Sequence, residues 1–144
     1  MDIETAVRLR MVIARLSRQL NATAAGEGLT PSEASALGLI ASRGPFGLTE
    51  LAAIEGLNPT MVSRIVSKLD DEHLIRRVQN SSDLRAANVE ITSSGAEVHD
   101  RIRAKRAEVV ARSFERMPDV SKAALETALP ALELLADELV HGQG

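Results

Sequence analysis

Residues 59–68, PTMVSRIVSK, carry short hydroxyl and cationic side chains at a spacing that suits one face of a helix. Side chains of these types hydrogen-bond to base edges and to phosphate oxygens, and an arginine can bind a guanine through two parallel hydrogen bonds. The pattern therefore predicts a helix that binds DNA in the major groove, and a plain solvated helix face is the alternative. The candidate contact residues are Pro59, Thr60, Met61, Ser63, Arg64, Ser67 and Lys68.

The other side of the same segment is apolar and predicts how the helix is held. Its apolar residues recur at i, i+3, i+4 and i+7, which makes one buried stripe. Asn58 before Pro59 is typical of a helix start, and Gly56 is a typical left-handed stop for a preceding short helix that opens near Thr49. Two helices joined by such a tight turn form a helix-turn-helix. The stripe consists of Val62, Ile65, Val66 and Leu69.

A hairpin is expected directly after this motif. IRRVQ (75–79) has strand character, residues 80–83 are turn-forming, and AANVEI (86–91) alternates like a returning strand. A helix-turn-helix followed by a two-stranded hairpin is a winged helix. Arg85 at the hairpin tip, held by Asp83, could reach a minor groove, and a solvated turn is the alternative. Arg76 and Arg77 are candidate phosphate contacts, or they pair with the acidic residues Asp70, Asp71 and Glu72.

Helices flank the winged helix on both sides. One spans about 3–24, a second opens with Thr30 and Glu33 as a capping box, a third runs from Thr92 to about 117, and a last one reaches about His141, with Pro130 expected to kink it. We expect a single domain, 1–144, with a DNA-binding lobe at 30–92 and dimerisation helices at 1–25 and 93–144. The expected dimerisation residues are Val7, Met11, Leu125, Leu129, Leu132, Leu135 and Leu139.

Composition excludes several classes of function. A chain of 144 residues with 44% hydrophobic and 26% charged residues suits one soluble domain, and no apolar run is long enough to span a membrane. Without cysteine there is no disulfide or thiolate zinc site, so a cytoplasmic location is expected. The sequence has no nucleophile motif and no phosphate-binding loop. We therefore expect neither an enzyme nor a protein that binds a cofactor. The net charge of −3 argues mildly against DNA, but the position of the cations matters more than their sum.

The residues above carry a family resemblance. The segment from LTELAA through PTMVSRIVSKL, a wing with Asp-x-Arg and EITSSG before the long helix resembles the MarR family of bacterial transcription regulators. The resemblance implies a mainly α fold with a β-hairpin wing, and a homodimer on a pseudo-palindromic operator. It also implies repression that a small anionic or phenolic effector relieves by binding between the dimerisation helices and the DNA-binding lobe.

The chain departs from the family pattern at two places, and two other functions stay open. His73 stands where the family usually ends the recognition helix with glycine, so it must adopt the left-handed conformation. Leu84 stands where a second wing arginine is common. The alternatives are a winged-helix module that binds a protein partner, and a metal-responsive regulator that uses His99 and His141, although the histidines lack ligand spacing.

Overall fold

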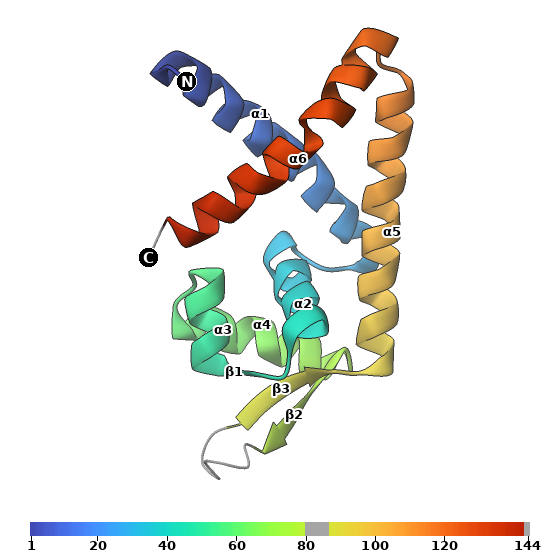
Figure 1. The fold of residues 1–144 in the computed structure, drawn as a ribbon. Helices are drawn as coiled ribbons and strands as arrows, with labels where there is room; N and C mark the ends of the chain where they lie inside the picture. The colour runs from blue at the N-terminus through green and yellow to red at the C-terminus, as the bar shows by residue number, and fades with distance from the viewer. Residues whose placement is uncertain (80–86, 143–144) are drawn as a thin grey trace. The chain divides into compact units, whose positions relative to one another are not determined.

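The computed structural model describes residues 1–79 and 87–142. The chain divides into two compact units, of which the first comprises Met1–Arg106 and the second begins at Ala107. Figure 1 shows the elements of each unit. In chain order they are α1 (Ile3–Asn21), the 3₁₀ helix η1 (Ala22–Glu27), α2 (Pro31–Arg43), β1 (Phe46–Gly47), α3 (Leu48–Glu55), α4 (Pro59–Asp71), β2 (Ile75–Gln79), β3 (Ala87–Ile91), α5 (Ser93–Glu115) and α6 (Asp119–His141).

Local capping interactions set where the helices of the first unit begin and end. At α2 the Thr30 hydroxyl accepts from the Glu33 amide at 3.2 Å, and the Glu33 carboxylate accepts from the Thr30 amide at 2.9 Å. This is the capping box that the sequence predicts. Gly56 ends α3 with a φ of 65°, a left-handed conformation that costs glycine little. The tight turn between α3 and α4 is therefore confirmed.

The sheet has one strand more than the sequence predicts. β2 and β3 form the expected antiparallel hairpin with Ile75 opposite Ile91, and β1 pairs with β3 on the other side, so that the strand order is β1-β3-β2. In Figure 1, β2 and β3 extend as a ribbon away from α2, α3 and α4. The prediction of a mainly helical fold with a β wing is confirmed, and the two residues of β1 complete a three-stranded sheet.

The core lies inside the first unit. It draws buried side chains from every element between η1 and the first half of α5, and Leu37, Leu69 and Val89 are completely buried. The predicted stripe of α4 is part of it, since its four residues are between 0% and 8% exposed. The packed core fixes α4 rigidly on one side, because a well-packed interior leaves few alternative positions for a helix.

The second unit contains the end of α5 and all of α6. Lys122 of α6 forms an ion pair with Glu115 at 3.1 Å and lies 5.9 Å from the ring centroid of Phe114. The helix continues through Pro130 to His141, and none of its described residues is buried within this chain. Over residues 1–79 and 87–142, no helix combines the length and apolarity that a membrane crossing requires.

Candidate nucleic-acid interface

The start of α4 is fixed by its own cap. The side-chain oxygen of Asn58 accepts from the Met61 amide at 2.9 Å, and Pro59 occupies the first turn, where its missing N–H costs nothing. This cap lies at the amino end of α4, where the helix dipole favours a negatively charged partner.

The outward face of α4 carries most of the predicted contact residues. While Val62, Ile65, Val66 and Leu69 face the core, the residues between them face solvent. This alternation follows from the helical repeat and separates a structural face from a polar face. The chemistry of the polar face suits base edges and phosphates, because it combines hydroxyl groups with a guanidinium. The exposed set is Pro59, Thr60, Met61, Ser63, Arg64 and Ser67.

Lys68 differs from the other predicted contact residues. Its Nζ donates to the backbone oxygen of Gly28 at 3.0 Å and to Glu33 Oε1 at 3.0 Å. The Glu33 side chain is only 6% exposed, whereas that of Lys68 is 39% exposed. Burial acts to raise the pKa of the Glu33 carboxyl, but hydrogen bonds from Thr30 and Lys68 outweigh it, so that the pKa lies below its ordinary value. The Glu33 carboxyl is therefore ionised at neutral pH.

The arginines of the first wing strand are paired within the chain. Arg76 pairs with Glu90, which stands opposite it on β3, and Arg77 lies 3.5 Å from Asp70 at the end of α4. Pairing of Arg77 with Asp70 was one of the two predicted possibilities, whereas Glu90 was not among the expected partners of Arg76. Both arginine side chains remain about half exposed or more, so pairing does not remove them from a surface. The wing residues Asp83 and Arg85 lie outside the described residues, as does Leu84.

Hydrogen bonds of Thr92 link the residues that follow α4 to the start of α5. His73 has a φ of 60°, which confirms the left-handed conformation that the family resemblance implies for it. The Thr92 hydroxyl donates to the His73 backbone oxygen at 2.6 Å and accepts from the Gly95 amide at 3.0 Å. The Thr92 amide donates to the Leu74 oxygen at 3.1 Å. One threonine thus caps α5 and also ties it to the residues that end α4.

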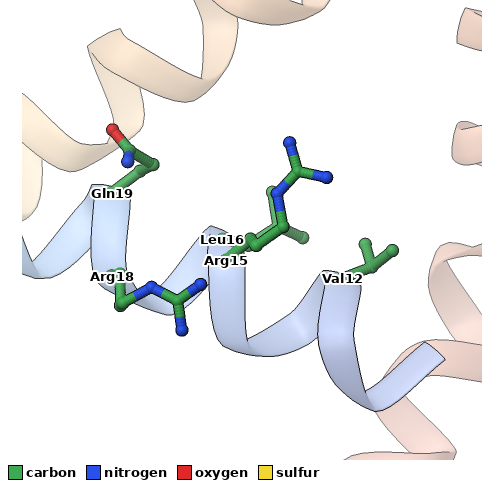
Figure 2. A pocket seen from close by; sticks show the side chains of 5 residues that line it. All are labelled: Val12, Arg15, Leu16, Arg18 and Gln19. Carbon is green, nitrogen blue, oxygen red and sulfur yellow. The ribbon is translucent and has the colours of Figure 1, made fainter. Parts of the chain in front are cut away.

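The apolar surface of α1 is largely exposed. Val7 is 45% and Met11 is 53% exposed, and no residue of α1 is buried in the described chain. Five residues of α1, Val12, Arg15, Leu16, Arg18 and Gln19, line a hollow of about 440 Å³. In Figure 2, the side chains of Val12 and Gln19 point to the same side of the helix, while that of Arg18 lies on the other side.

The histidines offer little support for a metal centre. His99 lies against Gly38, and Nδ1 of His141 is 2.7 Å from the Asp137 backbone oxygen. Among the residues that the structure describes, no three His, Cys, Asp or Glu side chains gather as a metal-binding group. The part of α4 that contains the hydroxyls and Arg64 is thus the strongest candidate site.

Comparison with known proteins assigns this architecture. Residues 29–87, which run from just before α2 to the start of β3, match the model of the MarR family. Over this segment the chain matches the MarR family. Its fold is also that of known regulators: it superimposes on the transcriptional regulator Tm0710 from Thermotoga maritima with a TM-score of 0.79 at 19% identity, over 97% of this chain and 99% of the other.

Other similar proteins agree with this assignment. The HTH-type transcriptional regulator Mb0904 of Mycobacterium bovis is 28% identical over 95% of this chain and 96% of its own. The HTH-type transcriptional repressor MdtR of Bacillus subtilis is 27% identical over 78% of this chain and 74% of its own. A Staphylococcus aureus MepR mutant bound to an oligodeoxyribonucleotide has a TM-score of 0.69 at 15% identity, over 94% and 99% of the two chains. These similar proteins are named as transcriptional regulators or repressors, and this chain shares the fold of the solved ones and matches the MarR family over residues 29–87.

Sequence reasoning missed two features of this MarR-family site. It placed Lys68 on the DNA-facing side without its partners Gly28 and Glu33, which lie 40 and 35 positions away in the sequence. It also assigned Val7 and Met11 to the apolar face of α1 without Leu16, which is 58% exposed. The i, i+4 spacing of Val12 and Leu16 could have revealed this longer apolar surface.

Proposed function

We propose that this MarR-family regulator is a homodimeric repressor that places α4 of each protomer in a major groove of a pseudo-palindromic operator. The observation that carries the proposal is the division of α4 into a buried apolar face and an exposed face with Thr60, Ser63 and Arg64. An exposed row of this kind on a rigidly packed helix can reach base edges without rearrangement. The repressor role is supported by the name of MdtR, a similar protein of Bacillus subtilis.

The wing completes the proposed DNA contact. Asp83 and Arg85 remain a prediction from the sequence, in which Arg85 enters the minor groove and Asp83 holds it. Arg76 and Arg77 stand at the base of the wing, and their exposed guanidinium groups are suited to phosphate contacts even though each has an acidic neighbour. A phosphate contact would then compete with the pairs to Glu90 and Asp70.

A second copy of the chain would cover apolar surface that the single chain leaves exposed. On α6, Leu125, Leu129 and Leu139 are between 41% and 56% exposed, and Leu132 and Leu135 are partly buried. On α1, Val7 and Met11 are about half exposed. Exposed apolar surface on two long helices is costly in water, and a two-fold symmetric partner buries it twice over. This surface supports the predicted dimerisation residues.

We further propose that a small organic anion releases the DNA in the bacterial cytoplasm. The hollow on α1 offers apolar surface from Val12 and Leu16 beside the guanidinium groups of Arg15 and Arg18. A molecule with a carboxylate and a small apolar body matches this combination, because arginine binds carboxylates through paired hydrogen bonds. Release would follow from a changed separation of the two α4 helices, whose half-sites lie roughly 34 Å apart on DNA.

Fluorescence anisotropy tests the proposed DNA binding. The purified protein is titrated onto labelled DNA from immediately upstream of its own gene, with scrambled DNA as competitor and salt as a variable. Arg64→Ala should weaken specific binding by about 1–3 kcal/mol, the usual cost of a lost guanine or phosphate contact. Arg103→Ala, an exposed arginine of α5, is the control.

Two results would contradict the proposal. Equal affinity for the upstream DNA and for scrambled DNA would exclude sequence-specific binding to that upstream region. Binding to neither DNA would favour a winged-helix module that binds a protein partner.

A further inference from the structure

Lys68 binds partners within the chain although it belongs to the polar side of α4. Its ammonium group lies 3.0 Å from the Gly28 oxygen and 3.0 Å from Glu33 Oε1, so two of its three N–H donors have partners within the chain. Gly28 follows η1 and ends it in the left-handed conformation, with a φ of 74°. The lysine therefore reaches from α4 to the segment that joins α1 to α2.

Glu33 explains why this contact is strong. The whole residue is 5% exposed, and its carboxylate also caps α2 by accepting from the Thr30 amide at 2.9 Å. A buried carboxylate needs a positive partner, because burying an unpaired charge is expensive. Moving the Lys68 ammonium to a DNA phosphate would leave Glu33 buried without its cation. The ion pair thus favours the inward position of Lys68.

The same segment is held on its other side by α5. Arg101 donates to both carboxylate oxygens of Glu27, at 2.9 Å and 3.1 Å. The hydrogen bonds that Arg101 donates keep the pKa of Glu27 below its ordinary value. Glu27 ends η1 and Gly28 follows it, so this point of the chain is linked to α4 and to α5. Lys68 is then one of the contacts that set where α4 lies against its neighbours.

We propose that Lys68 is a positioning residue for DNA binding: its ion pair with Glu33 and its hydrogen bond to Gly28 hold α4 so that Thr60, Ser63 and Arg64 meet the bases. The inference rests on the proposed function of α4. It replaces the expectation that Lys68 itself contacts DNA. Base recognition depends on the angle of the helix in the groove, so a small change at Lys68 would misplace every contact on the outward face.

Glu33→Gln distinguishes a positioning role of Lys68 from a phosphate contact, because the two roles predict opposite changes in operator affinity. Glutamine still caps α2, since either glutamate or glutamine closes a capping box, but it removes the charge. If Lys68 positions α4, the substitution weakens operator binding. If Lys68 contacts phosphate, the substitution releases it from a competing carboxylate and removes a negative charge near DNA, so binding strengthens.

The experiment measures operator affinity over a range of salt concentrations for four variants. These are Glu33→Gln, Lys68→Met, the double variant, and Asp71→Asn, which removes an exposed acid from the end of α4 without touching the ion pair. Circular dichroism and thermal unfolding verify that each variant is folded. Methionine keeps most of the lysine stem, so Lys68→Met tests mainly the charge.

If Lys68 positions α4, the operator affinities of the four variants should differ in a defined way. Glu33→Gln and Lys68→Met should each weaken operator binding about threefold to tenfold, and the double variant should be little weaker than either single variant, because both remove one interaction. The salt dependence of log K should keep its slope in Lys68→Met, because no phosphate contact is lost. Asp71→Asn should bind as tightly as the parent chain or more tightly.

Three results overturn the inference. They are a salt slope reduced by about one in Lys68→Met, tighter or unchanged binding by Glu33→Gln, or additive losses in the double variant. Failure of the parent chain to bind any operator would instead overturn the proposed function, so the two failures are distinguishable.

Discussion

Gly95→Ala should destabilise the protein more than any other glycine-to-alanine change outside the left-handed positions. A Cβ at Gly95 would overlap the Leu74 carbonyl oxygen, and it would lie 2.8 Å from the Leu74 carbonyl carbon and 2.9 Å from Ile91 Cδ1. Ordinary carbon contacts are about 3.5–4.0 Å, so the Leu74 peptide must move by about an ångström or more. That peptide accepts the Thr92 amide at 3.1 Å, so the joint between α4 and α5 is strained as well.

The magnitude follows from opposing effects. Overpacking against backbone costs about 1–3 kcal/mol, and weakening the hydrogen bond to Leu74 adds about 1 kcal/mol. The higher helix propensity of alanine returns up to about 1 kcal/mol. The net loss should be about 2 kcal/mol, which lowers Tm by roughly 4–8 °C in a domain of this size.

A graded series provides the control. A Cβ added at Gly26 would meet no other atom within 4 Å, so Gly26→Ala should change stability little. Gly38→Ala would place its Cβ 3.2 Å from the His99 ring, which can shift, so an intermediate loss is expected. Far-UV circular dichroism at one fixed protein concentration measures Tm, since the chain has neither Trp nor Tyr for fluorescence. Equal Tm values for Gly95→Ala and Gly26→Ala would refute the reasoning.

Three further predictions concern other sites. His73→Gly should raise stability by about 0.5–1 kcal/mol in denaturant unfolding, because glycine adopts the φ of 60° without strain. The pKa of Glu33 lies below its ordinary value of 4.5, so the ionised carboxylate stabilises the fold above pH 4.5 and this stabilisation is lost as the pH falls further. The difference in Tm between the parent chain and Glu33→Gln should therefore shrink on acidification. Leu129→Glu should convert the proposed dimer to monomer in analytical ultracentrifugation, and Glu133→Ala, at an exposed position on the same helix, should leave the oligomeric state unchanged.

Local signals were sufficient to predict much of the first unit. The capping box of Thr30 and Glu33 and the Asn58 cap each depend on residues at most a few positions apart, whereas the left-handed His73 was expected only from the family resemblance. Their conformations follow from nearby backbone groups and steric limits, which a sequence displays directly. The assignment of the apolar stripe on α4 is equally local, because the helical period alone decides it.

Long-range contacts could not be predicted in the same way. The two residues of β1 have no strand pattern of their own and become a strand only because Phe46 lies opposite Val89. Glu90 is the partner of Arg76 because the strand register places them opposite each other. Lys68 looks like a surface cation until Gly28 is brought near it by packing. Each of these depends on tertiary structure that residue spacing does not encode.

The contacts of α4 constrain how an effector could release DNA. Its later part is linked to Glu33 and Gly28 through Lys68, and the residues that end it are linked to α5 through Thr92. Polar links with defined geometry resist small displacements but can exchange partners, unlike the continuous apolar core beneath them. A shift of α5 or of the η1 segment should therefore reach α4 through Lys68 and Thr92. Substituting either residue should weaken the coupling between effector and DNA, even where the effector still binds.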